Sequence, residues 1–100
     1  MRHNPDYNSA PVLETAKRLG ARIRLARKAQ KRTLAELEEV CRVHRQTLAR
    51  LERGDPGVSM GVMLSVLEAL RTLSDVELLV TTPDPQPYRQ AALPPLERDF

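Results

Sequence analysis

The chain has 100 residues, enough for one modest hydrophobic core and too few for a second domain. Apolar residues make up 41%, but the aromatic ones are only Tyr7, Tyr88 and Phe100, which favours a helical core over a sheet. The single cysteine, Cys41, excludes an intramolecular disulfide and a cysteine-rich zinc framework. Because the start of the chain is polar and no apolar run approaches the roughly 18 residues of a membrane span, we expect a soluble cytoplasmic protein.

The formal net charge of +3 hides a strong asymmetry along the chain. Residues 13–54 contain 12 Lys and Arg against five Asp and Glu, whereas the remaining residues contain four and eight. A basic block of this kind is typical of a surface that contacts a polyanion, although it also suits a helix face that meets only water. Charge alone therefore leaves both interpretations open.

Residues 1–11 are polar and lack periodicity, so we expect a flexible N-terminal arm. A first helix is predicted over 12–29, because apolar residues recur there every three or four positions. Gly20 in its middle costs about 1 kcal/mol relative to Ala, which indicates a close helix approach or a slight bend. The apolar stripe consists of Leu13, Ala16, Leu19, Ile23 and Ala26.

A short second helix follows. Thr33 and Glu36 have the spacing of a capping box, which predicts a helix over 33–41. Arg42 and Val43 then form the predicted turn. The inward residues of this helix are Leu34, Leu37, Val40 and Cys41.

A third helix is predicted over 44–53, with Leu48 and Leu51 facing inward and Gly54 as a left-handed residue after its end. Two short helices joined by a tight turn can place the second one in the major groove of DNA, which is about 12 Å wide. Long polar side chains at the exposed start of that helix can bind base edges, Arg to guanine and Gln to adenine. The predicted base-contacting residues are His44, Arg45, Gln46 and Arg50.

Ser59 is the predicted N-cap of a fourth helix. Its inward residues close the core, so residues 12–72 form one predicted helical domain. These inward residues are Val62, Met63, Val66, Leu67 and Leu70.

Residues 73–82 carry two conflicting signals. Ser74 and Glu77 repeat the capping-box spacing, whereas the alternation of side chains is typical of a strand, which we favour. A lone strand cannot satisfy its backbone, so it would pair with its copy in a second subunit. Five prolines after Thr82 predict a disordered tail over 83–100. The residues predicted to form the dimer contact are Val76, Leu78, Leu79 and Val80.

The segment TLAELEEVCRVHRQTLARLERG, residues 33–54, resembles the lambda-repressor-like (XRE-type) helix-turn-helix family. Flanking helices of suitable length extend the resemblance over 13–70. It implies an all-α DNA-binding domain of four or five helices, with the short dimerisation strand after it. The matching positions are Ala35, Glu36, Leu37, Val43, Arg45, Thr47, Leu48, Arg50, Glu52 and Gly54.

The resemblance also implies roles for individual residues. Base contacts fall to Arg45, Gln46 and Arg50, with His44 nearby, and Arg27 forms a structural ion pair with Glu52. The basic residues Arg22, Arg24, Lys28, Lys31 and Arg32 either form a solvated face or touch phosphates. The predicted phosphate contacts are Arg27, Arg32, Thr33, Thr47 and Arg53.

Four positions depart from the family pattern. Leu34 replaces a phosphate-binding glutamine, and Glu38 replaces a small residue where two helices cross. Arg42 replaces the turn glycine, so it must accept a left-handed conformation or change the turn. His44 replaces a serine cap, which weakens the start of the third helix. Such changes fit altered DNA sites or a protein-binding helical adaptor without DNA binding.

The segment ERGDPGVSMGVMLSVLEAL, followed by VELLV, is similar to HipB-type antitoxins. That resemblance implies a homodimer that binds a HipA-like kinase toxin and represses its own operon. A free-standing phage-type repressor is the alternative. We expect no enzyme, metal or cofactor, because His3 and His44 lack partner ligands and no nucleophile has an evident base.

Overall fold

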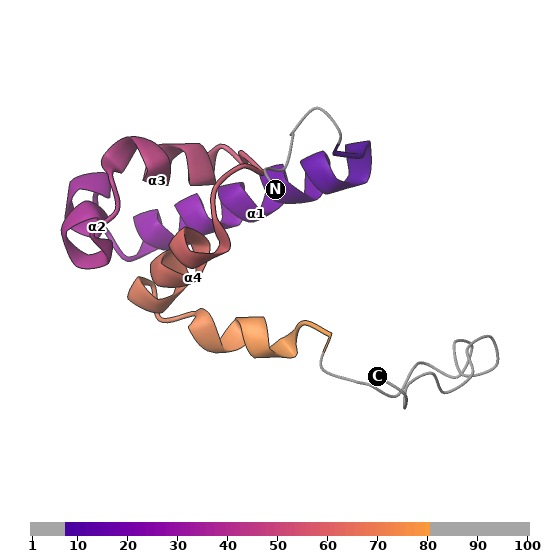
Figure 1. Cartoon of the computed structure of the whole chain (residues 1–100). Helices are drawn as coiled ribbons and strands as arrows, with labels where there is room; N and C mark the ends of the chain where they lie inside the picture. The colour runs from indigo at the N-terminus through magenta and orange to yellow at the C-terminus, as the bar shows by residue number, and fades with distance from the viewer. Residues whose placement is uncertain (1–7, 81–100) are drawn as a thin grey trace.

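The computed structural model describes residues 8–80, and this part of the chain is entirely helical (Figure 1). The helical core predicted from composition and periodicity is therefore confirmed for these residues. Within them, no helix is both long and apolar enough to cross a bilayer. The elements are α1 (Ala10–Ala29), α2 (Leu34–Cys41), α3 (Arg45–Glu52), α4 (Met60–Ala69) and the 3-10 helix η2 (Leu73–Leu78).

The long helix α1 begins at Ala10, two residues before the predicted start and inside the predicted arm. Ser9 is its N-cap, and the hydroxyl accepts a hydrogen bond from the Val12 amide at 3.3 Å. Pro11 lies in the first turn, where its missing N–H has no helical partner to lose. Pro11 therefore belongs to the first turn of α1 and not to the predicted arm. Residues 1–7 lie outside the described residues.

The crossing of α1 and α3 depends on two glycines. A Cβ on Gly20 would lie 2.5 Å from the carbonyl oxygen of Leu51, so no side chain fits there. Gly54, directly after α3, has φ +85°, and a Cβ on it would lie 2.5 Å from Cα of Lys17. Of the two interpretations of Gly20, close helix approach is the correct one. This close approach sets the position of α3 on α1, and Figure 1 shows the two helices lying against each other.

Every α-helix contributes residues to one core, and Leu70, directly after α4, is also part of it. Val40 was predicted to face inward, but it is 57% exposed. On α2 the core stripe runs through Leu34, Leu37 and Cys41, and Val40 falls to one side of it. The buried apolar residues are Ile23, Leu37, Leu48, Leu51, Val66 and Leu70.

Over the described residues, the strand predicted for 73–82 does not form in this single chain, where Leu73–Leu78 is the 3-10 helix η2. A 3-10 helix satisfies backbone groups locally, as in the 3.0 Å bond from the Asp75 amide to the Thr72 carbonyl. A strand would need a neighbour for the same groups. Hydrogen bonds within the segment therefore take the place of the predicted pairing with a second strand.

The capping-box spacing of Ser74 and Glu77 also fails to produce a cap. Thr72 occupies the N-cap position of η2 and makes no side-chain capping bond. Residues 81–82 and the predicted tail, 83–100, lie outside the described residues.

Candidate nucleic-acid interface

The helix α2 starts at the predicted capping box. The Thr33 hydroxyl accepts from the Glu36 amide at 3.0 Å, and the Thr33 amide donates to Glu36 Oε1 at 2.8 Å. At the other end, Arg42 adopts the left-handed conformation with φ 58°. The turn thus keeps its ordinary geometry, at a conformational cost of about 1–2 kcal/mol for a residue other than glycine.

The start of α3 is capped by His44. Its Nδ1 atom accepts a hydrogen bond from the Gln46 amide at 3.1 Å. The expectation that this histidine weakens the helix start was wrong, because the imidazole nitrogen performs the task of a serine hydroxyl. With Nδ1 used as an acceptor, the exposed Nε2 edge is what His44 can offer to a ligand.

The outward face of α3 follows from its buried face. Leu48 and Leu51 are 1% and 7% exposed and anchor the helix in the core. On the opposite side, Arg45 and Gln46 are exposed, and Arg50 one turn later is partly exposed. The structure therefore brings three of the four predicted base-contacting side chains onto one accessible surface, and His44 lies at the start of the same helix.

Two of these side chains are held by carboxylates. Arg45 Nε lies 3.1 Å from Glu38 Oε1, so the glutamate expected to disturb the crossing of α2 and α3 forms an ion pair at the surface instead. Arg50 Nε lies 2.8 Å from Asp55 Oδ2. Hydrogen bonds from Arg50 and from the Gly57 amide lower the pKa of Asp55 below its ordinary value of 3.8. Neither ion pair was predicted from the sequence, because Glu38 and Asp55 were not considered as partners of an arginine.

Arg27 and Glu52 form a buried ion pair between α1 and α3. The guanidinium donates from Nε to Glu52 Oε2 at 2.6 Å, from Nη2 to Oε1 at 3.0 Å and from Nη1 to the Arg32 carbonyl at 2.8 Å. The bond to Glu52 raises the pKa of Arg27 despite burial. Since Arg27 is 8% exposed and all three nitrogens have acceptors, it does not fit the predicted phosphate contact.

Arg32, a predicted phosphate contact, also supports α4. Its Nη1 atom donates to the Ala69 carbonyl at 2.6 Å, and Gln30 Nε2 donates to the Leu70 carbonyl at 2.9 Å. Both side chains satisfy carbonyl groups at the C-terminal end of α4, which has no basic residue in its own last turn. The role of Gln30 was not predicted, because no sequence signal connects it with Leu70, which lies 40 positions further along the chain.

The remaining predicted phosphate contacts lie at the ends of α2 and α3. Thr33 is exposed at the start of α2, Thr47 is partly buried in the first turn of α3, and Arg53 is exposed directly after α3. Leu34, by contrast, packs against the core. The apolar side chain of Leu34 therefore offers no donor for the phosphate contact that the family pattern assigns to a glutamine.

A family model described as a helix-turn-helix domain matches residues 18–79. The chain belongs to the helix-turn-helix family. No curated protein matches it. The matched range begins within α1 and ends just after η2, so the helix-turn-helix domain includes the whole interface described above. Membership in this family indicates a DNA-binding regulator.

Proposed function

We propose that this helix-turn-helix protein is a sequence-specific DNA-binding repressor of transcription that inserts α3 into the major groove. One observation carries the proposal: Leu48 and Leu51 bury one face of α3, which leaves Arg45, Gln46 and Arg50 on the accessible face. The groove is about 12 Å wide and accepts a single helix. Arginine can bind guanine with two hydrogen bonds, and glutamine can bind adenine in the same way.

Contacts to the backbone of DNA would come from residues around the same helix. Thr33, Thr47 and Arg53 keep this role, and His44 lies beside the base-contacting residues through its Nε2 edge. Arg27 is removed from the set because its donors serve the fold. Arg32 keeps its predicted phosphate contact, because within the described residues only its Nη1 atom is used to hold the end of α4. Phosphate contacts of this kind set the orientation of the protein on the duplex.

The acidic residues of α2 are compatible with this proposal. Glu36 is used in the capping box with Thr33, and Glu38 is paired with Arg45. Two of the three carboxylates on this short helix therefore have donors in the protein, which reduces their repulsion of phosphates.

A duplex-selection experiment at about 50 and 200 mM salt tests the proposal. We expect a defined sequence preference and a steep loss of affinity at the higher salt, because phosphate contacts release counterions. A chain that binds no duplex at the lower salt concentration would instead be the protein-binding adaptor.

The variant Gln46→Ala then tests the base contact. We expect it to lose about 1–3 kcal/mol of discrimination at one base pair, because one pair of hydrogen bonds is removed. Arg18→Ala, at an exposed position of α1, is the control and should lower binding slightly on all duplexes. An equal loss on every duplex for Gln46→Ala would assign this residue to the backbone.

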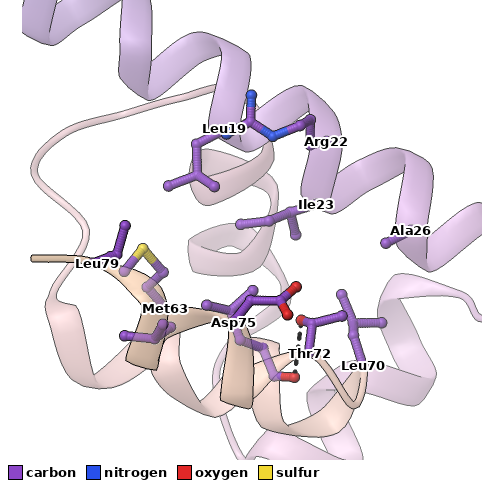
Figure 2. A pocket seen from close by; sticks show the side chains of 11 residues that line it. Leu19, Arg22, Ile23, Ala26, Met63, Leu70, Thr72, Asp75 and Leu79 are labelled. Carbon is purple, nitrogen blue, oxygen red and sulfur yellow. Dashed lines mark hydrogen bonds between the residues drawn. The ribbon is translucent and has the colours of Figure 1, made fainter. Parts of the chain in front are cut away.

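We further propose that the repressor is a homodimer formed through its C-terminal apolar residues. Leu78, Leu79 and Val80 are 72%, 65% and 98% exposed, an unusual apolar surface for a monomer. Of these three, Leu79 lines a groove of about 380 Å³ between α1, α4 and η2, together with Val76 (Figure 2). No residue of α3 lines this groove, so a dimer leaves the base-contacting face free.

The occupant of this groove is a second copy of the chain. Its walls carry Leu19 and Ile23 on α1 and Met63 on α4, while Arg22 and Asp75 lie on facing rims (Figure 2). In a two-fold dimer each Arg22 can approach an Asp75 of the other copy, so the surface is complementary to itself in charge as well as apolar character.

The similarity of residues 52–80 to HipB-type antitoxins supports one extension of the proposal. The dimer would repress its own operon and bind a HipA-like kinase toxin. Co-expression with a kinase encoded beside this gene tests it, and the expected result is a complex that survives gel filtration. Separate elution of the two proteins would favour the free-standing, phage-type repressor.

A further inference from the structure

We propose that Asp55 is a specificity-determining residue, which positions the Arg50 guanidinium so that its two terminal nitrogens bind the O6 and N7 atoms of a guanine. This proposal rests on the DNA-binding function proposed above. It assigns a role to the loop between α3 and α4, which lies outside the helices that sequence analysis considered.

Asp55 is itself held in one position. Its Oδ1 atom accepts from the Gly57 amide at 2.7 Å, and its own amide donates to the Arg50 carbonyl at 3.0 Å. The other oxygen, Oδ2, accepts from Arg50 Nε at 2.8 Å. Both carboxylate oxygens are therefore used, and the Arg50 side chain meets an acceptor that is fixed by the loop backbone.

The way in which Arg50 is held leaves its terminal nitrogens available. Within the described part of the chain, Arg50 donates from Nε and from neither Nη atom. Arg27 shows the contrasting case, since Nε, Nη1 and Nη2 all donate within the protein. The side chain of Arg50 is 41% exposed, so its free end is accessible to a ligand.

The chemistry of that free end suits guanine. The two terminal nitrogens of a planar guanidinium can donate in parallel to two acceptors, and in the major groove guanine offers such a pair in O6 and N7. Gly57 lies beside this end, and even a Cβ there would make only ordinary van der Waals contact with Arg50 Nη2, at 3.6 Å. A long side chain that is already oriented also loses less freedom on binding.

The second arginine pair is less constrained. Arg45 Nε lies 3.1 Å from Glu38, and the arginine side chain is 57% exposed. Within the described residues, the Glu38 carboxylate takes no second hydrogen bond comparable to that from Gly57 to Asp55. Asp55 is therefore the stronger case for a positioning residue.

The Asp55 carboxylate should favour one base through Arg50, but it should lower the affinity for DNA of any sequence. It repels phosphates on every sequence, whereas it orients Arg50 for one base only. Removing the charge should thus separate the two quantities: binding to unrelated duplexes stays equal or becomes tighter, while discrimination at one base pair falls. A role limited to folding would lower both.

The experiment uses the full chain and the duplex site obtained by selection with the wild type. Binding is measured for that site, for versions with each base pair replaced and for an unrelated duplex. The variants are Asp55→Asn, Arg50→Ala and the double variant, with thermal melting as a check of folding. Glu68→Gln is the charge-matched control, since Glu68 is exposed on α4 and forms none of the ion pairs of the described residues.

We expect Asp55→Asn to reduce the preference for guanine at one base pair by about 3- to 10-fold, a part of what a bidentate contact supplies. The same substitution should have no further effect in the Arg50→Ala background, because Asp55 acts through that side chain. Glu68→Gln should leave the preference unchanged.

Three results would overturn the proposal: an Asp55→Asn effect that equals that of Glu68→Gln, an effect that persists without Arg50, or a sharper preference for guanine in Asp55→Asn. A wild-type chain without any preferred duplex would instead refute the DNA-binding function itself, so the two failures are distinguishable.

Discussion

The ion pair of Arg27 and Glu52 ties α1 to α3, and both side chains are at most 10% exposed. Removing the arginine leaves a buried carboxylate without its partner. We expect Arg27→Ala to lower the free energy of unfolding by about 3–5 kcal/mol in urea titrations. Arg24 is the matched control, because it is 58% exposed and its Nε lies 4.0 Å from the same carboxylate. Arg24→Ala should cost less than about 1 kcal/mol, and equal losses would show that Arg27 is not the main partner of Glu52.

The lowered pKa of Asp55 predicts how its contribution to stability depends on pH. A carboxyl group with a depressed folded-state pKa stabilises the fold above its ordinary value of 3.8. This stabilisation is lost as the pH falls through the lower folded-state value. The difference in unfolding free energy between wild type and Asp55→Asn should therefore be constant from about pH 7 to pH 5 and shrink below about pH 4. A difference that grows on acidification would contradict the direction of the shift.

At the scale of elements, the contact of α1 with α3 depends on Gly20. A Cβ there would lie 2.5 Å from the Leu51 carbonyl oxygen and 2.8 Å from the Gly54 amide nitrogen. Backbone atoms cannot move aside as a flexible side chain can, so we expect Gly20→Ala to cost about 1–3 kcal/mol of stability. This loss should outweigh the gain of about 1 kcal/mol in helix propensity.

Gly61 in α4 is the control for this experiment. The nearest atom to a Cβ on it, Ser59 Oγ, lies at 3.9 Å, so Gly61→Ala should be neutral or stabilising. Thermal or urea unfolding of the two variants measures the difference. Two equal effects would mean that helix propensity, and not the crossing, determines the outcome at Gly20.

For the whole molecule, the proposed dimer makes a prediction about mass. Light scattering should give a dimer for the wild type at micromolar concentration and a monomer for Leu79→Asp, since that leucine lines the groove and is 65% exposed. Leu25→Asp is the matched control, because Leu25 is 67% exposed on α1 and lies outside the groove. A monomeric wild type, or the same mass for both variants, would contradict this interface.

Local features of the domain could be predicted because their signals lie three or four residues apart. Ser59, the capping box of Thr33 with Glu36 and the left-handed Gly54 each act through nearby backbone groups. The apolar spacing of α3 likewise determined that Arg45 and Arg50 face outward. Predictions of this kind need no knowledge of the rest of the fold.

The sequence by itself therefore determined the α-helices, most of the core and the accessible face of α3. Only the tertiary structure decided which arginine donors are used within the fold, because their acceptors come from distant segments. Arg27 meets Glu52 across 25 positions, and Arg32 meets the Ala69 carbonyl across 37. The structure also decided that Leu73–Leu78 is a 3-10 helix. Periodicity describes which side chains share a face, whereas a backbone's choice between strand and helix depends on whether a neighbouring strand is present to accept its hydrogen bonds.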